Sequence, residues 1–384
     1  MKQNIAVIFG GVSCEHDISI ISAVQAMKNI DVNYYNIIPI YITKSGAMLT
    51  GKKLLNIDSF SNFNNSKTRL VSFCVGSNYL FVKTIFGYRK SIAIDVALIV
   101  MHGENGEDGK VVSLLNMCGI PHTACSGLNG ELCLDKCVFK EYLKGIGIKT
   151  IKGVNLFSYD YYNNPEKHKK NIYNALGYPL IIKPATLGSS IGIVIAHNKQ
   201  ELEEGLAVAF KYCNKVLIEK FLQDIVEVNV AVMGCENNLI VSETEQPINK
   251  SDILSFDNKY LQGDVKGMQS LSRVIPAKVD SEVTTKIKNI AKHIFLHMGL
   301  KGVVRFDFIV DKNNNIYVNE LNSIPGSLAF YLFEPVGIKY NELINKLLKF
   351  AYVEYNANYN LIKTFSSSVL DGCKLGKGVK NNYA

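Results

Sequence analysis

Two short stretches near the C-terminal end have residue types and spacing that suit metal-assisted phosphate chemistry. They are Val-Val-Arg-Phe-Asp-Phe-Ile-Val at 303–310 and Ile-Tyr-Val-Asn-Glu-Leu-Asn at 316–322, joined by the turn Asp-Lys-Asn-Asn-Asn. Alternate side chains of a strand share one face, so a β-hairpin built from these stretches brings Asp307, Glu320 and Asn322 together beside Arg305. Hard oxygen donors next to a fixed cation predict a site for Mg²⁺ and a polyphosphate.

The residues after this hairpin favour a ligand site over the alternative, a half-exposed hairpin whose polar side chains are simply solvated. They read Ser-Ile-Pro-Gly at 323–326. A glycine directly beyond the two carboxylates lets the backbone come close to a bound ligand. We therefore expect Gly326 to border the site.

A glycine-serine loop is the second candidate for phosphate binding. It reads Lys-Pro-Ala-Thr-Leu-Gly-Ser-Ser-Ile-Gly at 183–192, between two predicted strands, and it lacks the P-loop pattern. Lys183 offers a point charge, and Ser189 and Ser190 offer hydroxyls and backbone N–H groups to phosphate oxygens. The alternative is an ordinary flexible hairpin tip.

Three further residues are candidates for nucleotide contacts because of their place in the chain. Lys136 begins a predicted helix, and Glu219 and Glu227 flank Phe221-Leu222, where the chain crosses between two predicted units. Carboxylates at such a crossing suit an adenine amine and ribose hydroxyls. Each of the three also fits a purely structural role.

Two loops near the N-terminus predict contacts with a small substrate. Glu15 follows the apolar strand 5–9 and Gly10-Gly11, where a carboxylate suits the ammonium of a small molecule. The pattern is not G-x-G-x-x-G, so NAD binding and an α/β oxidoreductase are disfavoured. His102 opens an acidic, glycine-rich loop and is a candidate polar contact or proton carrier, although a lone histidine also fits a structural role.

Periodicity predicts three units and a tail. The first, 1–133, is a Rossmann-like domain with a parallel sheet, and the second, 134–222, is a small α+β domain that carries the glycine-serine loop. The third, 223–362, is a mixed sheet with the hairpin, and 363–384 is the tail. The predicted strands are 5–9, 36–42, 95–101, 179–183, 191–195, 216–219 and 228–233, the helices are 18–30, 111–118, 135–144, 200–212, 280–298 and 340–352, and 51–70 and 243–269 are polar excursions.

Composition narrows the class of protein. The chain has 384 residues and a formal charge of +8 that is spread along it, without a Lys/Arg block interleaved with aromatics, so nucleic-acid binding is not indicated. Nine cysteines without a C-x-x-C pair fit a reducing cytoplasm. The apolar run near the N-terminus is too short for a signal segment or a membrane span, and we expect no membrane association.

Taken in order, these motifs resemble those of the ATP-grasp superfamily and, within it, the D-alanine:D-alanine ligase family. The resemblance spans about residues 4–350 and implies an ATP-grasp fold. Its motifs are Phe-Gly-Gly-Val-Ser-Cys-Glu at 9–15, His-Gly-Glu-Asn-Gly-Glu-Asp-Gly at 102–109, Leu-Asp-Lys at 134–136, Lys-Pro-x-x-x-Gly-Ser-Ser-x-Gly at 183–192, Phe-Asp-Asn-Lys-Tyr at 256–260, Arg-x-Asp at 305–307 and Asn-Glu-x-Asn-Ser-Ile-Pro-Gly at 319–326.

The resemblance implies roles for individual residues. ATP would be held by Lys136, Lys183, Ser189, Ser190, Glu219 and Glu227, and two Mg²⁺ ions, for which Mn²⁺ can substitute, by Asp307, Glu320 and Asn322. Glu15 and His102 would bind the first D-alanine, and Arg305 with the Gly326 N–H would stabilise the oxyanion. Ser189, Tyr260 and Glu15 would form a network that holds the 243–269 loop closed. The family also implies a cytoplasmic homodimer that serves peptidoglycan synthesis.

The segment after Gly326 departs from the family pattern. Many members carry a Ser-Leu pair that binds the carboxylate of the second substrate, and here either Tyr331-Leu332 or Ser327-Leu328 takes that place. The Lys259-Tyr260 pair resembles the dipeptide-forming branch. Two alternatives stay open: a paralogue that joins D-alanine to D-serine or another D-amino acid, and a nucleotide-binding homologue that has lost ligase activity.

Overall fold

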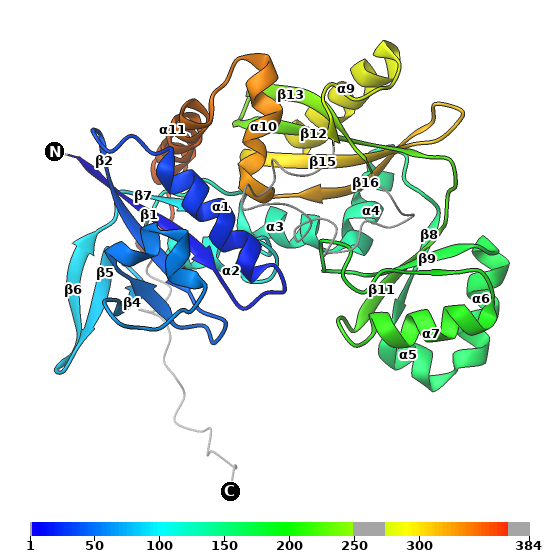
Figure 1. Cartoon of the computed structure of the whole chain (residues 1–384), viewed down its shortest axis with the longest axis horizontal. Coiled ribbons are helices and arrows are strands. Elements are labelled where there is room, and N and C mark those ends of the chain that lie inside the picture. Colours follow the sequence, from blue (N-terminus) through cyan, green and yellow to red (C-terminus); the bar gives the residue numbers. More distant parts are fainter. Residues whose placement is uncertain (1, 249–272, 368–384) are drawn as a thin grey trace, which may run out of the picture.

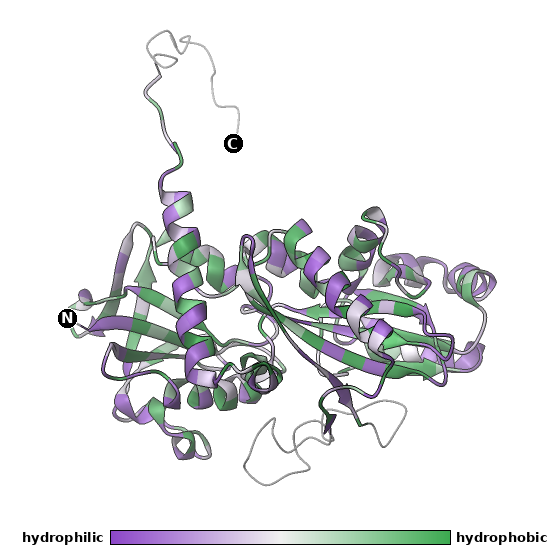
Figure 2. Cartoon of the chain, turned by 90° about the horizontal axis from the view of Figure 1, so that it is seen from above, coloured by the Kyte–Doolittle hydropathy of each residue, from purple (hydrophilic) through white to green (hydrophobic). Residues whose placement is uncertain are grey.

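Three β-sheets with helices on their faces make up the computed structural model, which describes residues 2–248 and 273–367 (Figure 1). The sheets follow one another along the chain, as the sequence predicts. Figure 2 shows that the strands are largely hydrophobic, whereas the covering helices carry hydrophilic stretches. Within the described ranges, no helix combines the length and hydropathy that crossing a bilayer requires.

The N-terminal sheet has seven strands in the order β6-β5-β4-β3-β2-β1-β7. Strand β1 pairs in parallel with β2 and β7, and its continuous apolar run is fully buried beneath α1. The sequence analysis misses the antiparallel strands that extend this sheet from β3 to β6. The bounds are β1 Gln3–Gly10, α1 His16–Lys28, β2 Tyr35–Ile42, β3 Met48–Thr50, β4 Arg69–Cys74, β5 Ser77–Thr84, β6 Gly87–Ala93, β7 Val96–Ile99, α2 Lys110–Met117 and α3 Gly127–Leu134.

The central sheet has four antiparallel strands in the order β10-β9-β11-β8. Its core is formed by aliphatic residues of the sheet and of α6 and α7. Strand β10 is shorter than predicted, because the loop between β9 and β10 runs on to Ile193. The bounds are β8 Gly153–Phe157, α5 Ser158–Asn163, α6 Pro165–Leu176, β9 Leu180–Pro184, β10 Val194–Ala196, α7 Lys199–Ala209 and β11 Lys215–Lys220.

The C-terminal sheet has the order β14-β13-β12-β15-β16, and all of its pairs among the described residues are antiparallel, where a mixed sheet was expected. The expected polar loop from 243 is also wrong in part, because β13 continues to Pro247 with Thr244 and Glu245 paired to β12. The bounds are β12 Val226–Cys235, β13 Asn238–Pro247, β14 Arg273–Val274, α9 Ser281–His297, β15 Gly302–Val310, β16 Ile316–Asn322, α10 Phe330–Phe333 and α11 Tyr340–Tyr359.

Helix α4, Lys136–Gly145, lies between the central and C-terminal sheets. Phe139 and Leu143 pack into the core of the C-terminal sheet. Cys137 packs against Ala185 and Leu217 of the central sheet. The helix therefore joins the two sheets through side chains on different faces.

Gly109 and Gly147 provide a matched pair for testing how tightly the fold is packed. Both have positive φ, +75° and +74°, but a Cβ on Gly109 would lie 2.4 Å from the Cα of Gly127, whereas one on Gly147 meets nothing within 4 Å. We expect Gly147→Ala to cost about 1–2 kcal/mol of unfolding free energy through backbone strain alone. Gly109→Ala should cost about 1–3 kcal/mol more through overpacking, measured by urea unfolding. Equal losses in the two variants would contradict this packing.

Candidate functional site

The β15–β16 hairpin brings its polar residues together as predicted. Arg305 pairs with Asn322 across the strands, and Asp307 pairs with Glu320. The Arg305 guanidinium donates from Nε and Nη2 to the two carboxylate oxygens of Asp307, at 2.6 and 2.7 Å. The Asn322 amide donates to Asp307 Oδ2 at 3.2 Å. This two-pronged contact fixes the carboxylate plane beside the other donors.

These residues fit a divalent cation shared with phosphate. Asp307, Glu320 and Asn322 supply hard oxygen atoms, and the two carboxylates are balanced by Arg305 and by Lys136, whose Nζ lies 3.2 Å from Glu320 Oε2. Among the described residues, no three or more His, Cys, Asp or Glu side chains form a metal cluster of their own. A Mg²⁺ ion usually takes one or two protein carboxylates and completes its shell with phosphate and water oxygens. The donor set is of that kind.

Two lysines converge on this hairpin from other elements. Lys183 lies at the end of β9, and its Nζ donates to Asn319 Oδ1 of β16 at 3.0 Å. Lys136 begins α4, and its Nζ donates to the Leu187 carbonyl at 2.6 Å. Both side chains are buried. The predicted phosphate-binding lysines therefore stand next to the predicted metal-binding residues.

Glu219 lies inside the protein and contacts two ammonium groups. Its side chain is fully buried, forms an ion pair with Lys140, and places Oε2 2.8 Å from Lys183 Nζ. Burial alone would raise the pKa of Glu219, but the two lysines outweigh it and lower the pKa. The sequence analysis misses Lys140, although its spacing of four residues from Lys136 places it on the same helix face.

Glu227, the other carboxylate expected near a nucleotide, lies half-buried on β12 opposite Ile309. It is two residues from Asn229, which pairs with Asp307, so Glu227 shares the face of the sheet that carries the site. Its direct contact with a nucleotide remains a prediction, as does that of Glu219.

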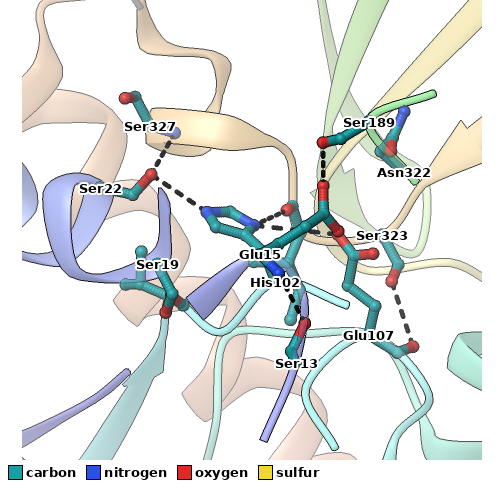
Figure 3. Close-up of polar contacts among 12 residues, drawn as sticks. Ser13, Glu15, Ser19, Ser22, His102, Glu107, Ser189, Asn322, Ser323 and Ser327 are labelled. Carbon is teal, nitrogen blue, oxygen red and sulfur yellow. Dashed lines mark hydrogen bonds and ion pairs between the residues drawn. The ribbon is translucent and has the colours of Figure 1, made fainter. Parts of the chain in front are cut away.

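The glycine-serine loop reaches the N-terminal domain through Ser189. The Ser189 hydroxyl donates to the Glu15 carboxylate, and Ser189 and Ser190 have φ of +53° and +60° (Figure 3). A Cβ on Gly188 would lie 3.1 Å from the same carboxylate, so the loop approaches closely because that position is glycine. The expected contact between Glu15 and Ser189 is confirmed. Tyr260 and Lys259, expected in the same network, lie outside the described residues.

His102 links the N-terminal domain to the segment that follows β16. Its Nδ1 donates to the Ile324 carbonyl at 2.7 Å, and its Nε2 lies 3.0 Å from the Ser22 hydroxyl (Figure 3). Ser22 Oγ in turn accepts the Ser327 N–H at 3.0 Å, which leaves its proton to point at Nε2. These contacts are satisfied by a neutral imidazole with the proton on Nδ1.

Glu107 is a second site residue that the sequence analysis does not single out. It is buried, with a carboxylate oxygen 3.9 Å from His102 Nδ1, and its backbone carbonyl accepts from Ser323 at 3.4 Å. Burial raises the pKa of Glu107, while the His102 contact opposes that shift. The sequence analysis also misses Ser22. Because Ser22 follows Glu15 by two helical turns, the two residues lie on the same face of α1, and this spacing could have indicated that Ser22 is near the site.

The segment after Gly326 is held in an unusual backbone conformation. Ser327, Leu328 and Ala329 all have positive φ, from 50° to 54°, which is costly for residues other than glycine. The Ser327 hydroxyl donates to Gln25 Oε1 of α1 at 2.6 Å. Leu328, like Leu332, is a core residue, so neither apolar side chain lines an open surface.

Tyr331 belongs to a buried polar cluster on the face of the C-terminal sheet that carries Asp307. Its hydroxyl donates to Glu245 Oε2 at 3.0 Å, and the Arg273 guanidinium lies 4.0 Å from its ring centroid. Glu245 pairs across the sheet with Asn229, and Asn229 pairs with Asp307. Tyr331 is therefore positioned beside the Arg305–Asp307 pair.

The comparisons with known proteins all match this chain to one protein family. A family model described as "D-ala D-ala ligase N-terminus" matches residues 4–125, and one described as "D-ala D-ala ligase C-terminus" matches residues 142–349. A D-alanine--D-alanine ligase from Thermosipho africanus is 37% identical over 96% of this chain and 98% of its own length. One from Thermosipho melanesiensis is 39% identical over 90% of this chain and 92% of its own length.

Solved structures of similar proteins have the same fold. The VanG D-Ala:D-Ser ligase from Enterococcus faecalis is 31% identical, with a TM-score of 0.77 over 91% of this chain and 100% of that chain. The D-alanine-D-alanine ligase from Coxiella burnetii is 22% identical, with a TM-score of 0.78 over 93% of this chain and 96% of that chain, and it bears on the fold alone.

Ser22 should prove important for stability because it satisfies two buried groups at once. In Ser22→Ala, His102 Nε2 and the Ser327 N–H lose their partner, and we expect a loss of about 1–3 kcal/mol in the free energy of unfolding. Ser113→Ala is the control. Within residues 2–248 and 273–367, the Ser113 hydroxyl donates to the Gly109 carbonyl within one helix turn, and its loss should cost less than about 0.5 kcal/mol. Urea unfolding measures both, and a Ser22→Ala variant as stable as Ser113→Ala would contradict the network.

Proposed function

The chain belongs to the D-alanine–D-alanine ligase family, and on that premise we propose that it joins two D-alanine molecules, with cleavage of ATP to ADP and phosphate. The main observation behind the proposal is a group of polar residues in which Asp307, Glu320 and Asn322 lie next to Arg305 and Lys136. This group of residues suits a reaction in which a phosphoryl group is transferred to a carboxylate. The product would enter peptidoglycan precursor synthesis in the cytoplasm, and we expect a homodimer.

ATP is held by residues from the central and C-terminal sheets. Lys136 and Lys183 face its phosphates, and the loop that carries Ser189 and Ser190 covers them with N–H groups and hydroxyls. Glu219 and Glu227 are assigned to the adenosine end. Asp307, Glu320 and Asn322 would hold two Mg²⁺ ions, for which Mn²⁺ could substitute, and the bound ions would neutralise phosphate charge.

The first step makes the carboxyl group of one D-alanine reactive. Glu15 binds the ammonium group of that molecule, and His102, fixed by Ile324 and Ser22, stands beside it. The carboxylate oxygen attacks the γ-phosphorus, a new O–P bond forms, and the bond to the β-phosphate oxygen breaks to release ADP. The product is an acyl phosphate, which water would destroy. The Ser189–Glu15 contact closes the loop over the site and excludes water.

The second step forms the peptide bond. The free amine of the second D-alanine, whose ammonium proton passes to solvent, attacks the acyl carbon and gives a tetrahedral intermediate with a negative oxygen. Arg305 and the Gly326 N–H are assigned to stabilise this oxyanion, and phosphate then leaves with the former carboxylate oxygen. The nitrogen gives up its extra proton to the departing phosphate as the C–O bond to phosphate breaks. Asp307 holds the Arg305 guanidinium in one orientation, so no reorganisation is required as the charge develops.

The carboxylate of the second substrate is assigned to the segment after Gly326. Ser327 uses both its N–H and its hydroxyl on α1, whereas Tyr331 presents its hydroxyl in the cluster with Glu245 and Arg273. The Tyr331 hydroxyl is also engaged, with Glu245, so both pairs, Tyr331-Leu332 and Ser327-Leu328, stay open. The Arg273 guanidinium over the Tyr331 ring adds a positive charge there, which favours the Tyr331 pair. Lys259 is expected to contribute from outside the described residues.

D-Serine is the second candidate for the second substrate, because the D-Ala:D-Ser ligase of Enterococcus faecalis is 31% identical over 91% of this chain. A panel of D-amino acids with ATP, read out by phosphate release and product mass, decides between the two. We expect D-alanyl-D-alanine as the main product and at least about tenfold less D-alanyl-D-serine at equal concentrations. ATP binding without any amino-acid-dependent ADP release would overturn the ligase assignment.

Glu320 tests the metal assignment. In Glu320→Ala one of two carboxylates is lost, and we expect the rate of ADP formation to fall by about 10³-fold or more with the fold retained. Glu282→Ala is the control, since Glu282 is exposed on α9 and, among the described residues, pairs with Lys286, one turn away. Near-normal activity of Glu320→Ala, with circular dichroism unchanged, would refute the assignment.

A further inference from the structure

A fully buried lysine, Lys140, has no part in the reaction as described so far. Its side chain is only 3% exposed, and its ammonium forms an ion pair with Glu219, which is 0% exposed. Burying an ammonium group is costly unless it is paired, so packing alone does not explain why residue 140 is a lysine. A methionine or leucine would fill the same space without that cost.

The ion pair continues from Lys140 through Glu219 to Lys183. Glu219 Oε2 lies 2.8 Å from Lys183 Nζ, and Lys183 is the residue that reaches the hairpin at Asn319. The three charges sum to one positive charge. If Glu219 had Lys183 as its only partner, that pair would be neutral and would attract phosphate only weakly.

Lys140 approaches from a different layer of the protein than its partners. It lies on α4, whose Phe139 and Leu143 are anchored in the C-terminal core, whereas Glu219 and Lys183 lie on β11 and β9 of the central sheet. The charges of Glu219, Lys183 and Glu320 of β16 all act on the Lys140 ammonium. Lys140 therefore reaches Glu219 from helix α4, whereas Lys183 reaches it from the neighbouring strand of the central sheet.

We propose that Lys140 is a positioning residue that neutralises Glu219 from within the protein, so that Lys183 keeps its positive charge for the nucleotide phosphates. The inference rests on the proposed function in one respect, namely that Lys183 holds ATP. Lys140 itself touches no substrate. It acts through the charge and position of its partners, and its loss should weaken nucleotide binding in the ground state and transition state alike.

The test compares Lys140→Met, Lys140→Gln and Lys140→Arg. We expect Lys140→Met to raise the KM for ATP and the Kd for ADP, measured by calorimetry, by about tenfold or more, with kcat at saturating ATP within about threefold of wild type. Lys140→Arg keeps the charge and should restore both constants to within about threefold. Lys140→Gln keeps a hydrogen-bond donor without charge and serves if Lys140→Met does not fold; it should bind ADP like Lys140→Met.

Lys215→Met is the matched control. Lys215 forms an ion pair with Asp135 at 2.8 Å, and this pair, like the Lys140–Glu219 pair, joins β11 to α4. Lys215 does not belong to the Lys140–Glu219–Lys183 chain. Its loss should leave the Kd for ADP within about twofold. A Lys140→Gln variant that folds and binds ADP like wild type overturns the proposal, and so does a fall in kcat without a change in KM. A wild-type protein that binds ADP but forms no dipeptide would refute the ligase function instead.

Discussion

The pairing of buried charges where helix α4 lies between the central and C-terminal sheets is the constraint on which the rest of the structure depends. Lys136, Lys140 and Lys183 are all buried, and each contacts a carboxylate, either Glu219 or Glu320. An unpaired ion in that environment would cost several kcal/mol, so the sheets are stable only in an arrangement that keeps these partners together. On the proposed function, the same arrangement places these cations beside the phosphates of ATP. One set of contacts would then provide both structural charge balance and ligand binding.

The N-terminal domain completes the site through hydrogen bonds rather than ion pairs. Ser189 joins the glycine-serine loop to Glu15, and His102 joins the N-terminal sheet to Ile324. Ser22 connects His102 with Ser327, whose positive φ is maintained by its bonds to α1. Because the Ser189–Glu15, His102–Ile324 and Ser327–Ser22 contacts cross between domains, these residues come together only when all three sheets are in place.

Much of the fold was predictable because it is local. Strand β1 has a continuous apolar run, and residues 304–308 of β15 alternate between buried and half-buried positions, so both follow from periodicity. The end of β13 was not predictable, since Thr244 and Glu245 read as loop residues but lie in a strand that faces the site. The antiparallel order of the C-terminal sheet was missed for a related reason: strand direction is decided by which strands pair, and pairing is not encoded in any one segment.

The sequence by itself determined which side chains share a face, as with Arg305 and Asp307, and in what order the ligand-binding loops occur. It also determined the family, through motifs whose spacing is set by short strands and turns. Only the tertiary structure decided which charges meet: that Glu219 lies between Lys140 and Lys183, and that Tyr331 bonds Glu245. The physical reason is that such partners are far apart in the chain, and their interaction becomes strong only when packing removes them from water.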